Sequence, residues 1–295
     1  MPHPDLLYPL LPAALLEAAC CVVIAAVRTR EYLGALPPLA IAFVLWVMSM
    51  LPWCFYAQGS HGLLLAALTA PVAFWYVLLP RSRATDFVLL AGLAAVILAK
   101  SRLFRLIYPD PAAGFRIDIL GQLMWIRLGV GVMLLLRKAE GIHFGFWPTR
   151  EEWRIGFRCY LQAMPLGILT GFGLGMLRVG TPIEQWWQAP FAALAVFLGI
   201  FCVVAMSEEF LLRGLLLGWL RTAFGTRGAH IVATVVSGLV HLGFRSSFNW
   251  KFCILSAVVH WFFGKAYLEG NGIRAGMVAH ALVVTTWVMV FAKSG

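Results

Sequence analysis

The chain has 295 residues, of which 61% are apolar or aromatic and only 12% are charged. An ordinary soluble domain carries about 25% charged residues, and the mean hydropathy here is +0.85, so composition excludes a soluble enzyme, a disordered chain and a coiled coil. The net charge of +10 arises mostly from Lys and Arg between apolar runs, which indicates basic loops beside a membrane and no nucleic-acid partner.

Apolar segments follow one another along the whole chain, and most are long enough for a membrane-spanning helix of about 20 residues. The sequence begins MPHPDLLYPL, and its first basic residues, Arg28 and Arg30, come after the first apolar run; we therefore expect a retained span, not a cleaved signal peptide. We predict an all-α fold, a polytopic membrane helical bundle with about 8–10 transmembrane segments. The apolar segments cover residues 9–27, 36–56, 62–80, 86–99, 117–136, 159–177, 188–212, 229–244, 252–268 and 275–292.

A polar stretch over residues 137–160 separates two parts of the chain, 1–140 and 141–295. Thr149 and Glu152 have the T-x-x-E spacing of a capping box, so a helix is expected to begin directly after Thr149. Basic and aromatic side chains fall on different sides of this helix, which favours a position in the headgroup layer. An ordinary connecting helix is the alternative.

Ionisable residues inside apolar segments are informative, because a charge at the centre of a span costs at least about 2.5–3.5 kcal/mol. In the first part of the chain, Glu17 and Arg127 are isolated cases, and we interpret both as structural. In the second part, four consecutive apolar segments carry two adjacent glutamates, one arginine and three histidines. These residues are Glu208, Glu209, Arg213, His241, His260 and His280. Their concentration predicts a buried polar site.

Helical spacing gives the two glutamates separate roles. Glu209 and Arg213 are four residues apart and are expected to pair on one face. Glu208 lies about 100° round the helix, where it is free to act as a general base toward water. His241 and His280 come from other segments. One is expected to bind the same water as Glu208, and the other is expected to donate a hydrogen bond to a developing oxyanion.

The remaining polar and small residues have structural interpretations. A lone histidine in a span is usually a helix–helix hydrogen-bond partner, and we interpret His260 in this way. Several glycines lie in the apolar segments without the preceding strand or following Lys-Ser/Thr of a phosphate loop. We expect them to allow close helix packing; they are Gly171, Gly173, Gly175, Gly214 and Gly218.

The block SEEFLLRGLL, with His241 and His280 downstream, resembles the CAAX protease and bacteriocin-processing (CPBP) family of intramembrane glutamic endopeptidases. The segment HWFFGKAYLEGNGIRAGMVAHALVVTTW resembles the last two helices of that family, and the resemblance covers residues 145–292. It implies a CPBP-like protease core in residues 141–295, preceded by transmembrane segments of unknown role in residues 1–140.

The resemblance also implies roles for individual residues. The first family motif falls on Glu208, Glu209 and Arg213, the second on His241 and the last on His280. In the family's proposed mechanism, the first Glu and the second-motif His activate a water, without a metal, a cofactor or a covalent intermediate.

Two positions depart from the family pattern. Ser237 replaces the aromatic residue of the second motif, and Val284 stands where the last motif carries Asn or a similar polar residue. The family's Asn helps the last His to hold the oxyanion, and valine has no donor. Loss of one such donor costs about 10²–10³ in rate, so we expect weaker activity, not its absence.

These features predict a glutamic-type intramembrane endopeptidase that hydrolyses a membrane-associated protein or peptide, such as one with a C-terminal anchor or CAAX-like tail. We expect a multi-pass integral membrane protein of a prokaryotic inner (plasma) membrane, with the lipid bilayer and the substrate as its partners. One alternative is a non-catalytic membrane protein for bacteriocin immunity or transport. The other is a metal-dependent hydrolase, because Glu and His are zinc ligands, although no H-E-x-x-H is present.

Overall fold

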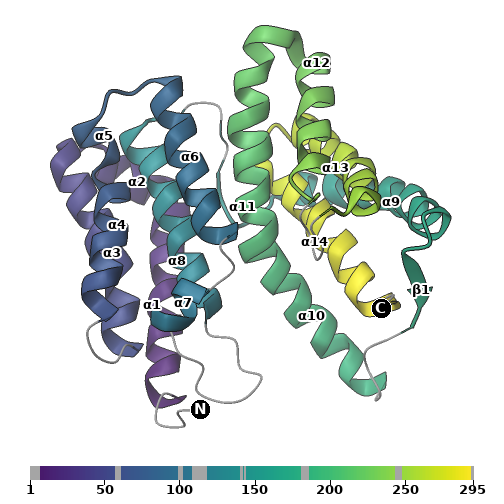
Figure 1. Cartoon of the computed structure of the whole chain (residues 1–295), viewed down its shortest axis with the longest axis horizontal. Helices are drawn as coiled ribbons and strands as arrows, with labels where there is room; N and C mark the ends of the chain where they lie inside the picture. Colours follow the sequence, from purple (N-terminus) through teal and green to yellow (C-terminus); the bar gives the residue numbers. More distant parts are fainter. Residues whose placement is uncertain are drawn as a thin grey trace. The chain divides into compact units, whose positions relative to one another are not determined.

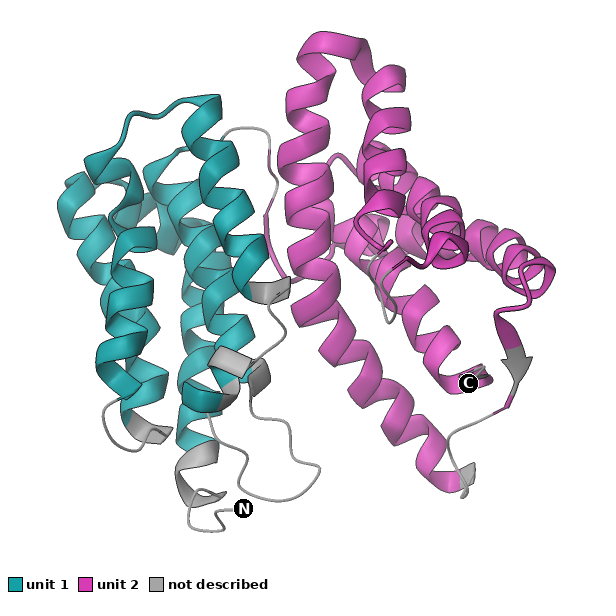
Figure 2. Ribbon diagram, in the orientation of Figure 1, with its two compact units in different colours: residues 1–140 teal, residues 141–295 magenta. Residues whose placement is uncertain are grey.

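The computed structural model describes residues 7–56, 61–98, 102–107, 118–139, 142, 144–180, 186–242 and 248–293. Helices form nearly all of the described structure (Figure 1), which confirms the predicted all-α class. The chain divides into two compact units, unit 1 with residues 1–140 and unit 2 with residues 141–295 (Figure 2).

Unit 1 is a bundle of apolar helices in which α1 packs against α3 and α8. α1 and α2 meet at Ala26 with a bend of 77° between Leu11–Ala25 and Val27–Gly34. The helices are α1 (Leu7–Ala25), α2 (Val27–Gly34), α3 (Pro38–Tyr56), α4 (His61–Ala73), α5 (Trp75–Leu78), α6 (Arg83–Leu98), α7 (Arg102–Ile107), α8 (Asp118–Gly131) and the π-helical η2 (Val132–Leu136).

A buried ion pair joins three helices of unit 1. Arg127 on α8 donates to the Glu17 carboxylate on α1 through Nε at 2.7 Å and Nη2 at 2.9 Å. Nη2 also donates to the Met48 carbonyl on α3 at 3.0 Å. Both charged side chains are buried, so the structural interpretation of Glu17 and Arg127 is confirmed.

Unit 2 consists of long helices and one short antiparallel ribbon. The ribbon pairs Leu177 with Lys293 and was not predicted, because each of its strands is only three residues long. The elements are α9 (Arg150–Gly173), β1 (Leu177–Val179), η3 (Trp186–Gln188), α10 (Ala189–Gly199), η4 (Ile200–Ala205), α11 (Met206–Glu209), η5 (Phe210–Leu217), α12 (Gly218–Leu239), α13 (Trp250–Gly270), α14 (Ile273–Val290) and β2 (Phe291–Lys293).

α9 begins with the predicted capping box. The Glu152 amide donates to Thr149 Oγ1 at 3.2 Å, and the Thr149 amide donates to Glu152 Oε2 at 2.7 Å. The helix then continues without interruption to Gly173 and packs against α13 and α14. The basic and aromatic residues after Thr149 therefore belong to the same helix as the apolar segment 159–177; their position in the headgroup layer stays a prediction.

The two glutamates lie in a long helical run that starts at Ala189 and ends at a turn. Gly225 has φ 64° and ψ 176°, a left-handed conformation that glycine adopts readily, and there α12 reverses direction (Figure 1). Within the run, the four-residue turn α11 stands between two π-helical stretches, η4 and η5. π-Helical turns are frequent at functional sites, and here they flank Glu208 and Glu209.

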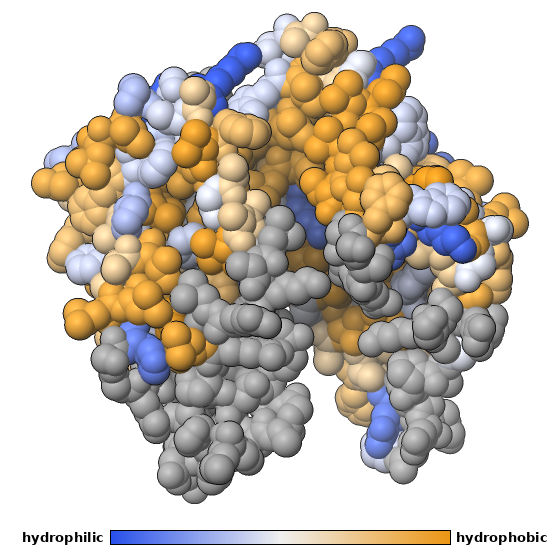
Figure 3. All heavy atoms as spheres, in the orientation of Figure 1, coloured by the Kyte–Doolittle hydropathy of each residue, from blue (hydrophilic) through white to orange (hydrophobic). Residues whose placement is uncertain are grey.

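The described helices have the length and surface of an integral membrane protein. Among them, two helical stretches are long and apolar enough to cross a bilayer, Ala189–Leu239, which turns at Gly225, and Ile273–Val290, or three if α1 and α2 form one bent span. Large apolar side chains are exposed on both units (Figure 3), among them Leu63, Phe87, Phe191 and Leu239. The number of about 8–10 spans stays a prediction.

The glycines divide into two groups. A Cβ atom on Gly171 would lie 3.2 Å from Trp287 Cη2 on α14, as close helix packing requires, whereas one on Gly214 would lie 3.0 Å from Ile142 Cγ2, which is in no helix. The packing interpretation is wrong for three others, because no atom of the described residues lies within 4 Å of a Cβ on Gly173, Gly175 or Gly218. Gly175 instead supplies a positive φ of 66° just after the end of α9.

Candidate functional site

Consecutive helices of unit 2 bring the predicted site residues together. Glu208 and Glu209 lie on α11, His241 follows the end of α12, His260 lies on α13 and His280 lies on α14. The helices that carry them pack against one another: α12 against α13, α13 against α14, and α11 against α14.

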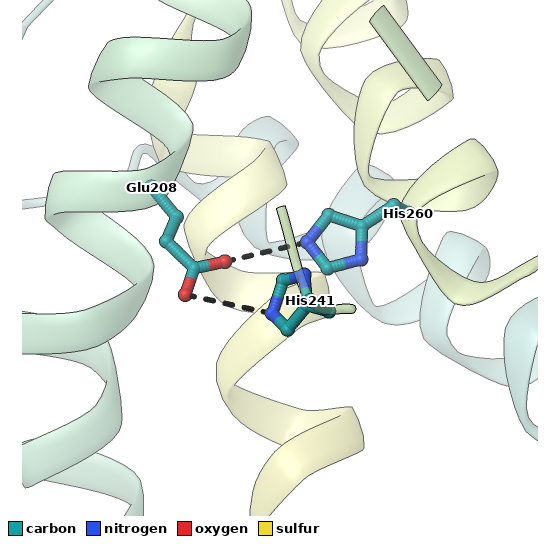
Figure 4. Close-up of side chains that lie close together, drawn as sticks. All are labelled: Glu208, His241 and His260. Atoms are coloured by element: carbon teal, nitrogen blue, oxygen red, sulfur yellow. Dashed lines mark hydrogen bonds and ion pairs between the residues drawn. The ribbon is translucent and has the colours of Figure 1, made fainter. Parts of the chain in front are cut away.

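The Glu208 carboxylate faces two imidazole rings (Figure 4). Its Oε2 is 3.3 Å from His260 Nε2, and its Oε1 is 4.0 Å from His241 Nε2. The side chains of Glu208 and His241 are 28% and 16% exposed, whereas that of His260 is 4% exposed. The side chains of Glu208 and His241 are therefore partly exposed, whereas His260 is buried.

Backbone carbonyls fix the hydrogen positions on both rings. His241 Nδ1 lies 2.7 Å from the Ser237 carbonyl, and His260 Nδ1 lies 2.8 Å from the Ser256 carbonyl. Because a carbonyl oxygen only accepts, each Nδ1 carries a hydrogen, and Nε2 is the ring nitrogen that faces Glu208. When the ring is neutral, this Nε2 is an acceptor. The Ser256 hydroxyl, 3.0 Å and 3.1 Å from the two Nδ1 atoms, links the rings. Two imidazoles and one carboxylate thus present acceptor atoms to a common point.

Glu209 belongs to a second, fully buried network. Its Oε1 lies 3.2 Å from His280 Nδ1 and 3.4 Å from Arg213 Nη1, so the predicted Glu209–Arg213 pair forms. Arg213 Nη2 also donates to the His260 carbonyl at 2.8 Å, which ties η5 to α13. The ring of Phe263 stacks on His280 with centroids 4.6 Å apart and planes 12° apart. The orientation of His280 is therefore set by a carboxylate at its edge and an aromatic ring on its face.

Gly276 on α14 allows this approach. A Cβ atom at that position would lie 2.7 Å from Glu209 Oε2 and 3.3 Å from the Phe263 carbonyl oxygen. Real Cβ contacts under 3.0 Å essentially never occur. The glycine therefore leaves the space that the buried carboxylate occupies against α14.

The structure brings Glu208 and His241 together as the sequence predicts, but it places the other histidines differently. His260 makes an interhelical contact, as expected, yet its partner is Glu208, so sequence reasoning missed its place in the site. His280 contacts Glu209, not Glu208. Placing a polar histidine in an apolar segment costs free energy at His260 just as it does at His241 and His280. This cost was the sequence signal that could have assigned His260 to the site.

The two positions that depart from the family pattern offer no donor to this site. The Ser237 hydroxyl donates to the Ala233 carbonyl at 2.7 Å within α12. Val284 is half-buried on α14, one turn beyond His280. The adjacent Thr285 Oγ1 is buried and has no hydrogen-bond partner among the described residues.

Residues 190–286 match a family model described as type II CAAX prenyl endopeptidase, Rce1-like. This match confirms the resemblance to the CAAX protease family, and it contains both glutamates, Arg213 and all three histidines of the site. It relates the chain to an intramembrane protease acting on a peptide or protein substrate. No curated protein and no solved structure matches the chain.

Proposed function

We propose that this protein is an intramembrane glutamic endopeptidase in which Glu208, assisted by His241 and His260, activates a water molecule. The observation that carries the proposal is the convergence of the Glu208 carboxylate and two Nε2 lone pairs on one point, within a segment that matches the Rce1-like family. Acceptors arranged in this way bind a molecule that brings hydrogens, and water brings two.

The three acceptors define the first chemical step. A water that donates one hydrogen to Glu208 and the other to an imidazole Nε2 keeps an oxygen lone pair for attack on the substrate carbonyl carbon. Glu208 takes the proton as the new C–O bond forms, and later gives it to the leaving amine as the C–N bond breaks. His260 Nε2 lies 3.3 Å from the carboxylate and His241 Nε2 lies 4.0 Å from it, and the wider separation better suits two acceptors that share one water.

His280 is the proposed donor to the oxyanion. Its Nδ1 is held by Glu209, so Nε2 is the ring nitrogen left to face the substrate. Donation from Nε2 requires hydrogens on both nitrogens, and the buried Glu209 carboxylate stabilises that imidazolium as the aspartate of a serine-protease triad does. Arg213 balances the second negative charge of the Glu208–Glu209 pair. In this proposal, Glu209 and Arg213 are positioning residues for His280.

A membrane-associated tail is the proposed substrate class. The Rce1-like match favours a CAAX-like C-terminus, and the partial exposure of Glu208 gives an extended peptide a way to reach the carboxylate. The exposed apolar side chains of the helices suit a substrate that is itself held in the bilayer, such as a prenylated peptide or a C-terminal anchor. We place the protein in a prokaryotic inner (plasma) membrane.

The test is hydrolysis of a prenylated CAAX peptide and of an anchor-tail peptide by the purified chain in lipid. Glu208→Gln keeps size and hydrogen bonding but removes the base, so the rate is expected to fall by about 10²–10⁴ with normal membrane insertion. Glu151→Gln is the matched control, because the Glu151 side chain is 67% exposed and forms a long, exposed pair with Arg154 at 3.9 Å. Full activity of Glu208→Gln on a substrate that the wild-type chain cleaves would overturn the assignment.

A further inference from the structure

We infer that Glu208, His241 and His260 also form a binding site for a divalent transition-metal cation such as Zn²⁺, and that the bound cation displaces the catalytic water and inhibits hydrolysis. Metal binding stands on the geometry of the three side chains alone. The inhibitory effect rests on the proposed function.

The donor set has the composition and spacing of a metal site. One ligand atom from each of the three side chains lies within 4.8 Å of the others, and the Glu208–His260 pair is at 3.3 Å. Zn–N bonds of about 2.0–2.1 Å in tetrahedral geometry put neighbouring ligand atoms about 3.3 Å apart. Small side-chain rotations therefore bring all three atoms to bonding distance, with the fourth position open.

The surroundings of the two imidazoles favour metal binding. A metal-ligating histidine almost always donates its other ring N–H to a carbonyl or carboxylate, which fixes the tautomer and the ring orientation. His241 and His260 both do so, through Nδ1 to the carbonyls of Ser237 and Ser256. The Nε2 lone pairs are thus set toward the cation site without any change of tautomer, and the Ser256 hydroxyl couples the two rings.

The same geometry explains why the cation inhibits. A metal bound by the Glu208 carboxylate occupies the lone pairs that would accept the water proton, so the base is lost. Zinc hydrolases with a His₂Glu ligand set rely on a further group as their base. Among the described residues of this site, the second carboxylate is Glu209, which Arg213 and His280 already hold.

Metal binding is tested on the full-length chain without a histidine tag, stripped with a chelator and titrated with Co²⁺ or Zn²⁺. We expect one cation per chain, with the visible spectrum of tetrahedral cobalt. Binding is expected to be lost in Glu208→Gln, His241→Ala and His260→Ala. It should persist in His230→Ala, the matched control, because His230 lies outside the cluster and packs against Trp261. Ser256→Ala, which removes only the linking hydroxyl, should weaken binding by about 10–100-fold.

The absence of stoichiometric binding to the wild-type chain would overturn the inference, whatever the variants do. Binding that survives in all three cluster variants would overturn it too, because the cation would then lie elsewhere.

The activity measurement separates this inference from the proposed function. We expect Zn²⁺ to abolish peptide hydrolysis and a chelator to restore it. If the wild-type chain binds no cation but Glu208→Gln is inactive, the metal inference fails and the proposed function stands. If the stripped chain is inactive and Zn²⁺ restores hydrolysis, the site stands as a metal site, while the inhibitory effect and the metal-free mechanism both fail.

Discussion

The Glu209 carboxylate accepts a hydrogen bond from His280 Nδ1 at 3.2 Å, and both side chains are buried. The adjacent Glu208 is half-buried and contacts two other imidazoles. Two neighbouring carboxylates thus contact different histidines. In the proposed mechanism, Glu208 activates the water and Glu209 holds the ring that donates to the developing oxyanion. Substitution of Glu208 should therefore affect the rate alone, whereas substitution of Glu209 should affect both the stability and the rate.

Glu209→Gln is expected to destabilise the fold and to lower the rate. Breaking a buried ion pair on one side costs about 3–5 kcal/mol, because Arg213, which is 1% exposed, would keep an unpaired charge. The neutral amide also no longer stabilises the His280 imidazolium. Thermal unfolding in detergent and kcat with KM on the peptide substrate are the measurements, with kcat expected to fall more than KM rises.

The double variant Glu209→Gln/Arg213→Met separates the two effects. Replacing both charges of a buried pair is often neutral for stability, so the double variant is expected to unfold near the wild-type temperature and to remain slow. A double variant with full activity would show that Glu209 has no part in orienting His280.

Gly276→Ala is expected to disrupt the site through the backbone of α14. The new methyl group would lie 2.7 Å from Glu209 Oε2, and the carboxylate cannot move away easily because His280 and Arg213 hold its other oxygen, Oε1. The matched control is Gly218→Ala, since nothing lies within 4 Å of a Cβ there and alanine favours a helix by about 1 kcal/mol over glycine. We expect reduced activity for the first variant and equal or higher stability for the second. Equal activity in both would contradict the tight packing of Glu209 against α14.

The sequence predicts contacts within one helix well and contacts between helices less well. The Thr149 capping box and the Glu209–Arg213 pair were predictable, because both depend on spacings of three and four residues along a single helix. The Glu208–His260 contact was not, because it depends on the rotation of α13 relative to α11, which side-chain packing sets. The π-helical stretches beside α11 also change the direction of side chains in a way that a regular 3.6-residue period does not describe.

The ion pair of unit 1 should be essential for its fold. Glu17→Gln leaves Arg127 buried among α1, α3 and α8 with a charge that has lost its carboxylate. We expect a loss of about 3–5 kcal/mol, measured by unfolding in denaturant. Glu31→Gln, at an exposed position of α2, is the control and should leave the unfolding midpoint unchanged. The double change Glu17→Leu/Arg127→Met should recover most of the stability; if it is as unstable as Glu17→Gln, the unpaired charge is not the cause.

Val284→Asn tests whether the oxyanion site lacks a donor. Position 284 lies one turn beyond His280, on the same face of α14, and valine there offers no hydrogen bond. An amide at this position is expected to leave the rate unchanged or to raise it by up to about 10²–10³, the effect of one oxyanion donor. The measurement is kcat on the peptide substrate, with KM determined in parallel.

Val284→Leu is the matched control for the asparagine variant, since the leucine side chain branches at Cγ as asparagine does and has no donor. Because a donor acts on the transition state, the asparagine should change kcat and leave KM nearly constant, whereas a steric effect would raise KM in both variants. Complete inactivity of both would mean that Val284 packs against the substrate. In that case the oxyanion would depend on another donor, and Thr285, whose buried Oγ1 has no partner among the described residues, is the first position to test by Thr285→Val.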